Sequence, residues 1–350
     1  MTSWYDRSGP GADVFVSSRV RVARNLAALP FDSKLKAEDA RALCDRVLAI
    51  FAGKEGYRTL RMDNLSRAEA MSLCERHYIS REFATKKGPR ALVIHEASGL
   101  SVMVCEEDHL RIQALATGLS AQECFRAAYE TEALIGEAME FAFDEKLGYL
   151  THCPTNLGTA MRVSVMLFLP ALTASGEISG LIPSLGQMGL TVRGMGGEGT
   201  EATGYLYQIS NQVTLGISEE ESLKKVTEAV RRIAKLERAR REQMDEGARL
   251  RLADRAGRAE GIFRYAHSLS SSEFLKLWSD LRLGVSVMDK TDLDVAVLDK
   301  MLFEAMPYTV SLALPNSTEH LPEEVRRDLA RAQAVRSILR SADSNPTKGR

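Results

Sequence analysis

Residues 14–22 read Val-Phe-Val-Ser-Ser-Arg-Val-Arg-Val, and the alternation of apolar and polar side chains along them predicts a β-strand. Arg19 and Arg21 stand two residues apart in this stretch. Because successive side chains of a strand point to opposite faces of a sheet, both guanidinium groups are expected on one face. Two arginines on a strand more often lie on a solvent-exposed face than in a functional site, so their role has to be inferred together with other motifs.

The chain on either side of this strand alternates short β-rich runs with helical stretches. Strand patterns cover residues 91–96, 100–105, 110–116, 162–169, 190–193 and 205–214. Helical periodicity covers residues 35–52, 66–77, 120–146, 218–249, 271–283, 292–305 and 322–341. In the third of these helices, Ser120 and Glu123 have the spacing of a capping box.

Strands joined by turns, with helices scattered among them, favour an α+β fold. We expect an antiparallel β-sheet flanked by helices on one face, followed by a C-terminal α-helical domain. A boundary near residues 245–255 divides the 350 residues into domains at 1–248 and 249–350. The arginine-rich part of the long helix, residues 231–241, is interpreted as a solvated face with ion pairs between residues four apart.

Composition excludes several classes of function. The hydrophobic fraction is 45%, the charged fraction is 27% and the formal net charge is −1, values that are ordinary for a soluble protein. With a net charge close to zero, the protein as a whole has no electrostatic attraction to nucleic acid or to an anionic membrane. No apolar run approaches the ~20 residues of a membrane span, and the N-terminus lacks the apolar segment of a signal peptide. A cytoplasmic protein is therefore expected.

The five cysteines, at positions 44, 74, 105, 124 and 153, stand alone. Their odd count and wide spacing argue against a disulfide framework, a zinc knuckle or a redox pair. Only Cys153 has neighbours that indicate chemistry, because Pro154 restricts the chain directly after it and could hold a thiolate against a cation.

Arginine recurs in four stretches that also carry the acidic residues and this cysteine. They are Ser17-Ser18-Arg19-Val20-Arg21, Glu106-Glu107-Asp108-His109-Leu110-Arg111, Cys153-Pro154-Thr155-Asn156 followed by Arg162, and Arg193-Gly194-Met195-Gly196-Gly197-Glu198. The planar guanidinium donates parallel hydrogen bonds that suit phosphate oxygens. No glycine-rich phosphate loop ending in Lys-Ser or Lys-Thr is present. Each stretch alone is a weak signal, but together they predict a phosphoryl-transfer site built on arginines.

The four stretches, spread over residues 14–215, resemble the motifs of the phosphagen (guanidino) kinase family. The resemblance implies that Arg19, Arg21, Arg111, Arg162 and Arg193 clamp the phosphates of ATP. It places the following further residues at the nucleotide: Ser17, Ser18, Val20, His77, Val163, Ser164, Val165, Met166, Gly194, Met195, Gly196, Gly197 and Glu198. Mg²⁺ would be held mainly by the nucleotide phosphates, with no metal ligand from protein side chains. Cys105 departs from the family pattern, which has asparagine before the two glutamates.

The same resemblance implies the catalytic roles. Glu107 would hold the substrate guanidinium and accept its proton, Glu198 would support it from the opposite side, and Cys153 would lie beside the reacting nitrogen. The physical chemistry agrees, because a guanidinium has delocalised lone pairs and a pKa above about 12. A catalyst must therefore align one nitrogen with the γ-phosphorus and remove a proton as the bond forms.

Within the family the chain resembles most closely the bacterial protein-arginine kinases. Small-molecule members carry a helical domain before the first arginine strand that helps to close over the substrate, and here that strand begins near residue 14. An open site could admit an arginine that is still part of a polypeptide.

The C-terminal stretch Arg327-Asp328-Leu329-Ala330-Arg331-Ala332 matches a motif that this branch uses as a phosphoarginine-binding allosteric pocket. On a helix Arg327 and Arg331 lie on one face and could pinch a phosphate. From the pattern alone, a surface arginine pair on an amphipathic helix, with Val325, Leu329 and Ala332 buried, is the more usual interpretation. Because the motif matches completely, the resemblance favours the pocket, formed by Arg327, Asp328, Arg331 and Ala332.

The resemblance also implies the cellular setting. Enzymes of this branch serve protein quality control and the stress response, act on a heat-shock repressor and unfolded proteins, and mark proteins for the Clp protease system. They are helped by a zinc-binding activator protein and form homodimers, often through the C-terminal helices.

Three alternatives stay open from the sequence. One is a kinase of small guanidino compounds, which activity on free arginine would support. Another is a phosphoarginine-binding adaptor with little activity, against which the presence of Glu107, Cys153 and Glu198 argues. A nucleic-acid binder using residues 231–258 is disfavoured by the near-neutral charge and by the absence of interleaved aromatic residues.

Overall fold

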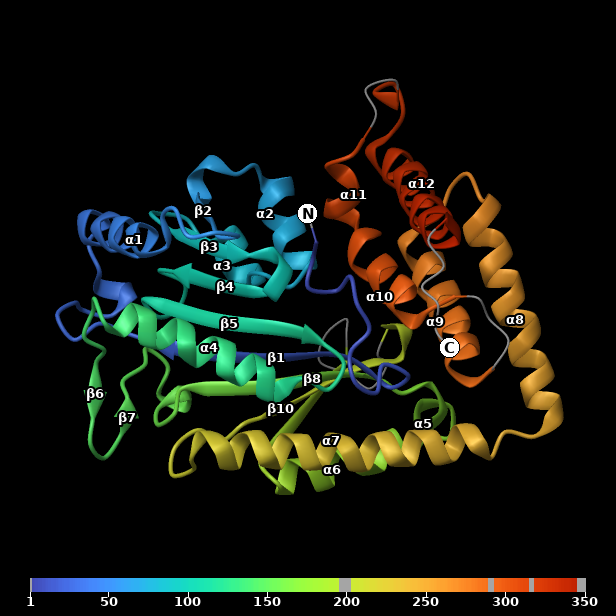
Figure 1. The fold of residues 1–350 in the computed structure, drawn as a ribbon, viewed down its shortest axis with the longest axis horizontal. Helices are drawn as coiled ribbons and strands as arrows, with labels where there is room; N and C mark the ends of the chain where they lie inside the picture. Colours follow the sequence, from blue (N-terminus) through green and yellow to red (C-terminus); the bar gives the residue numbers. More distant parts are fainter. Residues whose placement is uncertain (1, 195–202, 289–292, 315–317, 345–350) are drawn as a thin grey trace.

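The computed structural model describes residues 2–194, 203–288, 293–314 and 318–344. Within these residues an eight-stranded antiparallel sheet has the order β2-β3-β4-β5-β1-β8-β10-β9 (Figure 1). Its strands are β1 (Phe15–Arg24), β2 (Arg58–Arg61), β3 (Ala91–His95), β4 (Leu100–Val104), β5 (Leu110–Thr117), β8 (Met161–Phe168), β9 (Leu190–Gly194) and β10 (Leu206–Asn211). The antiparallel α+β fold predicted from the sequence is confirmed.

Strand β1, predicted at residues 14–22, lies in the middle of the sheet between β5 and β8. Val20 and Val22 are fully buried in the larger hydrophobic core on one face. Because side chains alternate along a strand, Arg19 and Arg21 share the other face. The alternation that predicted the strand therefore also divides the sheet into an apolar face and an arginine-bearing face.

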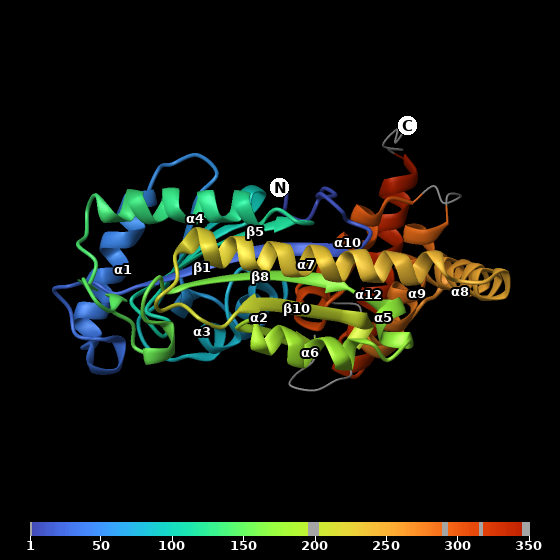
Figure 2. The same cartoon turned by 90° about the horizontal axis from the view of Figure 1, so that it is seen from below.

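Three long helices cover the apolar face, namely α1 (Ala37–Phe51), α4 (Ala121–Gly136) and α7 (Glu219–Glu242). Figure 1 shows α4 in front of the strands and α7 below them, and in the view of Figure 2 α7 crosses in front of β8. Each helix contributes aliphatic side chains to the core that contains Val20 and Val22, and burial of this apolar area is the main stabilising term of such a layer. These helices therefore support the sheet from the side opposite the arginines.

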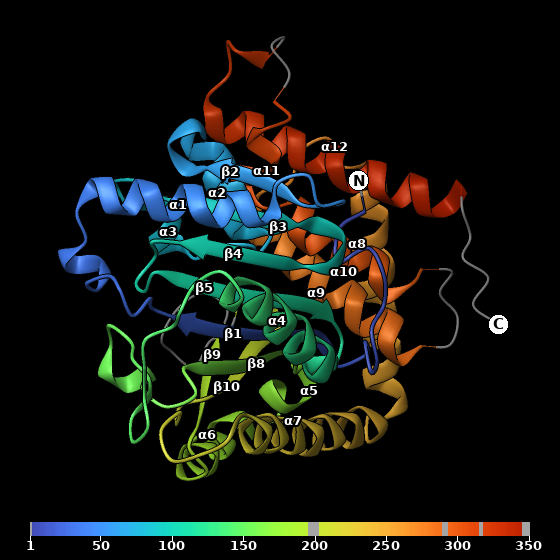
Figure 3. The same cartoon turned by 60° about the vertical axis from the view of Figure 1, so that its left-hand side comes forward.

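Among the described residues, helices also cover the arginine face, at its two ends only, so the prediction of helices on one face alone is wrong. At one end α2 (Arg67–Glu75) and α3 (Arg81–Thr85) pack on Met103 and Leu115. At the other end the C-terminal helices pack on Phe168 and its neighbours (Figure 3). The reason is that these strand positions are apolar on both faces and need cover. The uncovered middle carries the arginines.

The C-terminal helices are α8 (Glu246–Tyr265), α9 (Ser271–Val287), α10 (Val295–Glu304), α11 (Pro307–Ser311) and α12 (Glu323–Ser344). They surround a second core centred on Trp278 and Phe274. Figure 2 shows α8 running on beyond the strands after α7. Of the helices in the described ranges, none is both long enough and apolar enough to cross a membrane.

Buried arginines fasten the start of β1 to these helices. Arg241 of α7 donates to the carbonyl of Asp13 at 2.9 Å, and Arg282 of α9 donates to the carbonyl of Ala12 at 2.8 Å. Arg282 also forms an ion pair of 2.7 Å with the buried Asp299. The arginine-rich face predicted to be solvated is therefore partly structural, because Arg241 is only 5% exposed.

Two predicted helices end earlier than expected. The stretch 120–146 is helical only to Gly136 and continues into a hairpin of β6 (Phe143–Asp144) and β7 (Gly148–Tyr149). Ser120 forms no capping box, because its hydroxyl donates to the carbonyl of Thr117. The stretch 218–249 is interrupted after Glu242, and Asp245 caps the start of α8.

The remaining elements connect these layers. They are α5 (Pro170–Ala174), α6 (Ile178–Gln187) and the 3₁₀ turns Asp32–Lys34, Met62–Asn64, Glu96–Ser98, Pro154–Asn156 and Thr203–Tyr205. The division into domains at 1–248 and 249–350 stays a prediction.

Candidate active site

A cleft of about 270 Å³ opens on the arginine face of the sheet. It brings together five residues that the sequence motifs singled out: Arg21, Glu107, Arg111, Cys153 and Arg162. They come from β1, from the turn before β5, from β5, from the loop before β8, and from β8 itself. The other lining residues are Val22, Ala23, Thr155, Asn156, Ala160, Met161, Asn211, Gln212 and Thr214. Residues up to 141 positions apart, from Arg21 to Arg162, thus meet in one place.

Strand register explains how the arginines meet. Arg21 lies opposite Arg162 of β8, and Arg19 lies opposite Ser164 of the same strand. Arg19 donates to the hydroxyl of Ser164 at 3.3 Å and to the side-chain oxygen of Gln208 at 2.9 Å. Arg162 donates to the hydroxyl of Ser210 at 3.1 and 3.3 Å. These acceptors are neutral, so they orient the guanidinium groups without cancelling their charge.

The arginine cluster is electrostatically strained. Burial, and then the charges of Arg162 and Arg111, lower the pKa of Arg19 to about 10. Burial, and then Arg19, Arg111 and Arg162, lower the pKa of Arg21 well below its usual value. The pKa of Arg162 is lowered by burial and by the charges of Arg193 and Arg111. Among the described residues, Arg19, Arg21 and Arg162 form no ion pair with a carboxylate. Such a concentration of positive charge suits a site for a polyanion.

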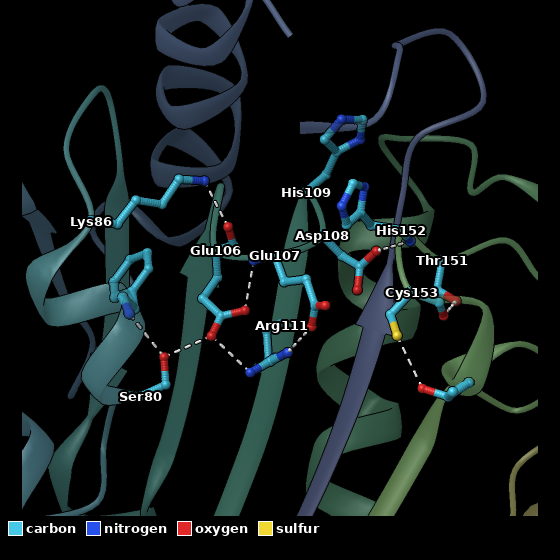
Figure 4. Close-up of polar contacts among 12 residues, drawn as sticks. Ser80, Lys86, Glu106, Glu107, Asp108, His109, Arg111, Thr151, His152 and Cys153 are labelled. Carbon is cyan, nitrogen blue, oxygen red and sulfur yellow. Dashed lines mark hydrogen bonds and ion pairs between the residues drawn. The ribbon is translucent and has the colours of Figure 1, made fainter. Parts of the chain in front are cut away.

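Arg111 differs from the other arginines because it is neutralised by two carboxylates (Figure 4). It donates to Glu106 at 2.7 Å and to Glu107 at 3.1 Å. Glu106 is almost fully buried and also accepts hydrogen bonds from the hydroxyl of Ser80 and from the backbone N–H of Glu107, each at 2.6 Å. Glu107 is more open, with 39% of its side chain exposed, so its carboxylate is the one available to a ligand in the cleft.

Cys153 faces the same cleft from a loop on the other side of β1 (Figure 4). Pro154 begins a 3₁₀ turn directly after it, as the local restriction by proline predicts. The Cys153 sulfur lies 3.0 Å from the hydroxyl of Thr155, and the hydroxyl of Thr151 donates to the Cys153 carbonyl at 2.9 Å. The loop is thereby ordered around the thiol.

His77 follows α2 and lies near Arg19 on the arginine face. Its backbone is left-handed, with φ of 65°, and its carbonyl accepts a hydrogen bond of 2.8 Å from Gln113. The imidazole packs edge-on against Phe303 of α10, with ring centroids 5.3 Å apart. Burial and the charge of Arg19 lower the pKa of His77 from 6.5 to about 3. The ring is therefore neutral near pH 7 and can exchange hydrogen bonds without adding to the positive charge.

This shift predicts a pH effect on stability. A histidine whose folded pKa lies below its unfolded value binds the proton more tightly when unfolded, so stability falls as the pH drops from 6.5 toward 3. We expect His77→Asn, which tolerates the left-handed backbone, to reduce this acid loss by about 1 kcal/mol between pH 7 and pH 4.5, allowing for solvent screening. Urea unfolding at both pH values measures it. His267→Asn, at an exposed position, is the control; equal acid losses in His77→Asn and wild type contradict the prediction.

Other residues assigned to the nucleotide lie apart from the cleft. Val20, Val163 and Val165 are buried in the core on the opposite face. Ser18 also points to that side, where its hydroxyl donates to the Gly118 carbonyl and accepts from the N–H of Ser120. Ser17 and Met166 are buried on the arginine side of the sheet, further from the acidic turn. These positions support the strands, while Arg19 and Arg21 between them lie on the arginine face.

The fourth motif is only partly described. Arg193 is exposed in β9 opposite Gln208, and Gly194 ends the strand. Met195, Gly196, Gly197 and Glu198 lie outside the described residues, and the predicted role of Glu198 stays a prediction.

The C-terminal arginine motif lies on α12. Arg331 is 1% exposed and donates to the carbonyls of Ala305 and Leu269 at 2.8 and 2.6 Å and to Asp328 at 2.6 Å. Arg327 is partly exposed and lies 3.9 Å from Glu323. Ala332 is buried, whereas Val325, expected on the buried side of an amphipathic helix, is 41% exposed. A ligand could reach Arg327 and Asp328 directly, but Arg331 only at the cost of its present contacts.

Sequence motifs missed the polar residues that hold the site together. Gln208 and Ser210 on β10 orient Arg19 and Arg162. Strand parity could have found them, because Gln208 and Ser210 are polar residues two apart that alternate with Tyr207 and Ile209. Ser80 belongs to none of the four motifs, and its contact with Glu106 has no sequence signal.

Comparisons with known proteins identify the family of the chain. The family model described as "ATP:guanido phosphotransferase, C-terminal catalytic domain" matches residues 41–240, and "Protein-arginine kinase McsB C-terminal domain" matches residues 249–349. A protein-arginine kinase of Pelotomaculum thermopropionicum is 38% identical over 340 residues, which is 95% of this chain and 94% of that one. A protein-arginine kinase of Moorella thermoacetica is 38% identical over 344 residues, or 97% of both chains.

Solved structures show a similar fold. Lombricine kinase superposes with a TM-score of 0.58 at 21% identity, covering 70% of this chain and 72% of that chain. The duplicated taurocyamine kinase from Schistosoma mansoni with bound transition-state-analog components superposes with a TM-score of 0.59 at 22% identity, covering 74% of this chain and 41% of that chain.

Proposed function

The chain belongs to the ATP:guanido phosphotransferase family and is an enzyme of that kind, and from this premise we propose that it phosphorylates arginine residues of proteins. The γ-phosphate of ATP would be transferred to the guanidinium to give phosphoarginine. The observation that supports this reaction is the cleft that joins Glu107 and Cys153 to a cluster of unneutralised arginines. The similarity to relatives named protein-arginine kinase supports a protein substrate.

The arginines would bind the phosphates. Arg19, Arg21, Arg162 and Arg193 bring positive charge that no carboxylate in the described residues pairs with. Burial, and then mutual repulsion, lowers the pKa values of Arg19, Arg21 and Arg162. A triphosphate relieves this repulsion, and the charge that spreads over the transferring phosphoryl oxygens in the transition state relieves it further. Mg²⁺ carried by the phosphates supplies additional neutralisation when bound, so a protein-based metal site is not required.

The carboxylates would handle the guanidinium. Glu107 is held by Arg111 through one oxygen, Oε2, which leaves Oε1 for a substrate guanidinium. As the N–P bond forms and the bond from γ-phosphorus to the ADP oxygen breaks, the guanidinium nitrogen loses a proton to this carboxylate. Cys153, across the cleft, would lie beside the same nitrogen. Arg111 thus orients the base in addition to contributing charge to the phosphate site.

Regulation through the C-terminal arginine motif is a further part of the proposal. Arg331 contacts the carbonyl of Ala305, two residues after Phe303, and the ring of Phe303 packs on His77 beside the arginine cluster. A phosphoarginine that engaged Arg327, Asp328 and Arg331 would compete for these contacts. The short path from α12 through α10 to His77 supports the idea that such binding changes activity.

We further propose the cellular setting that the family resemblance implies. The enzyme would act in the cytoplasm, in protein quality control and the stress response, on unfolded proteins and a heat-shock repressor. The Clp protease system would receive the marked proteins, a zinc-binding activator would assist, and the C-terminal helices would form a homodimer.

The test is phosphate transfer from γ-labelled ATP to an unfolded arginine-rich protein, with free arginine in a parallel reaction. We expect label on the protein that is lost in acid, because the P–N bond of phosphoarginine is acid-labile whereas phosphoserine survives. Label on free arginine alone would instead indicate a kinase of small guanidino compounds. If neither the protein nor free arginine is labelled, but the chain still binds phosphoarginine in a separate binding measurement, the result would indicate an adaptor.

A further inference from the structure

The turn that carries Glu107 is held from outside the cleft by two side chains, Lys86 and Asn25. Neither lines the cleft, and neither belongs to the four arginine motifs. They bind opposite ends of the turn. Lys86 contacts the backbone before Glu107, and Asn25 contacts the backbone after it (Lys86 is drawn in Figure 4).

Lys86 follows α3 and reaches the start of the turn. Its ammonium donates to the carbonyl of Cys105 at 2.9 Å and to the carbonyl of Glu106 at 2.7 Å, and it pairs with Asp32. Cys105 is held in a left-handed conformation, with φ of 62°, which is unfavourable for a residue with a side chain. A cation that collects two successive carbonyls stabilises this backbone and so determines where the next residue, Glu107, emerges.

Asn25, at the end of β1, holds the other end of the turn. Its side-chain oxygen accepts from the N–H of His109 at 2.9 Å, and its amide donates to Asp108 at 2.6 Å and to the carbonyl of Leu150 at 2.9 Å. The same Asp108 oxygen accepts from the N–H of His152 at 2.7 Å (Figure 4). Asn25 and Asp108 are both buried. Together they tie the Glu107 turn to the loop that carries Cys153.

We propose that Lys86 and Asn25 are positioning residues of the phosphoryl transfer. Lys86 sets the direction in which Glu107 leaves the turn, and Asn25 sets the separation between the Glu107 turn and the Cys153 loop. The inference rests on the proposed function, because it concerns the placement of the group that takes the proton. A shift of about 1 Å in a reacting group can lower a rate by about 10²-fold, so such supports matter although they touch no substrate.

The experiment compares Lys86→Met and Asn25→Ala with wild type in the protein-phosphorylation assay, with rates normalised to folded enzyme. We expect kcat to fall by about 10- to 100-fold in each variant, with the KM for ATP within about threefold of wild type. Lys86→Arg, which keeps a cationic donor, is expected to recover most of the rate. The matched control is Lys300→Met, which removes a lysine of similar exposure that pairs with Asp6 at 2.7 Å in the C-terminal region; its kcat is expected to be unchanged.

A second readout separates positioning from simple stabilisation. The rate at which iodoacetamide alkylates Cys153 should rise severalfold in Asn25→Ala, because the loop loses its tie, and should not change in Lys300→Met. Asn25→Ser is prepared in case the alanine variant does not fold. Normal kcat in both variants, with only a lower Tm, would overturn the proposal. If the wild-type enzyme phosphorylates no protein, the proposed function is wrong. The alkylation measurement does not depend on that activity, and an unchanged alkylation rate in the Asn25 variants would show that Asn25 does not position the Cys153 loop.

Discussion

Replacement of Glu107 by glutamine is expected to lower kcat by about 10²–10⁴-fold. Glutamine has the shape of glutamate but cannot accept the proton that leaves the guanidinium as the N–P bond forms. The KM for ATP should change little, because the phosphates are assigned to Arg19, Arg21 and Arg162 on the neighbouring strands. The measurement is steady-state transfer of phosphate from ATP to an unfolded protein, with nucleotide affinity measured separately.

A control variant removes an equivalent carboxylate outside the cleft. Glu177 forms an ion pair of 2.6 Å with Arg240 on the opposite side of the sheet, so Glu177→Gln is expected to keep full activity. Kinase activity in Glu107→Gln within about threefold of wild type would remove Glu107 as the base. A loss confined to the affinity for ATP would show that Glu107 acts through Arg111 on the phosphate site and takes no proton.

The fold was predictable wherever a single local pattern decided it. Alternation over residues 14–22 was sufficient to place β1, and its two-residue spacing was sufficient to place Arg19 and Arg21 together. Helix ends were less predictable, because they depend on tertiary partners. Ser120 has the composition of a cap, yet its hydroxyl bonds to Thr117, while Ser66 and Ser218 form real capping boxes with the same sequence pattern.

The site was predictable as a set of residue types but not as a set of contacts. The four motifs predicted Arg21, Glu107, Cys153 and Arg162 as site residues, and all four line the cleft. The pairing of Arg111 with Glu106 and Glu107 was not anticipated, since the spacing of a motif does not say which arginine is neutralised. Lys86 was beyond sequence reasoning because it binds backbone carbonyls, whose positions are unknown until the chain is folded.

The arginine cluster also links function to stability. Arg21 sits among Arg19, Arg111 and Arg162, and burial together with these charges depresses its pKa. Its guanidinium donates no hydrogen bond to another of the described residues, whereas those of Arg19 and Arg162 donate to serine and glutamine side chains. A charged group that has repulsive neighbours and no ion-pair partner destabilises the nucleotide-free protein. A polyanion that binds beside such a group removes this repulsion, and the energy gained contributes to its affinity.

Arg21→Met is therefore expected to have opposite effects on activity and stability. Loss of one clamping arginine should lower kcat/KM for ATP by about 10³-fold, the magnitude found when an arginine that stabilises a phosphoryl-transfer transition state is removed. The same change should raise the Tm of the nucleotide-free protein, because methionine fills a similar volume without the charge. Adding Mg-ATP should then raise the Tm of wild type more than that of the variant. Scanning calorimetry with and without Mg-ATP measures these shifts.

A matched arginine shows what an ordinary ion pair contributes. Arg238 binds both oxygens of Asp13 at 2.7 Å, away from the cleft. Arg238→Met should lower the Tm slightly and leave kcat/KM unchanged, because it breaks an attractive pair. If Arg21→Met lowered the Tm as Arg238→Met does, Arg21 would be a structural residue and the phosphate site would have to be built from the remaining arginines. A higher Tm together with a lower kcat/KM in Arg21→Met would mean that the arginine cluster serves ligand binding and destabilises the nucleotide-free protein.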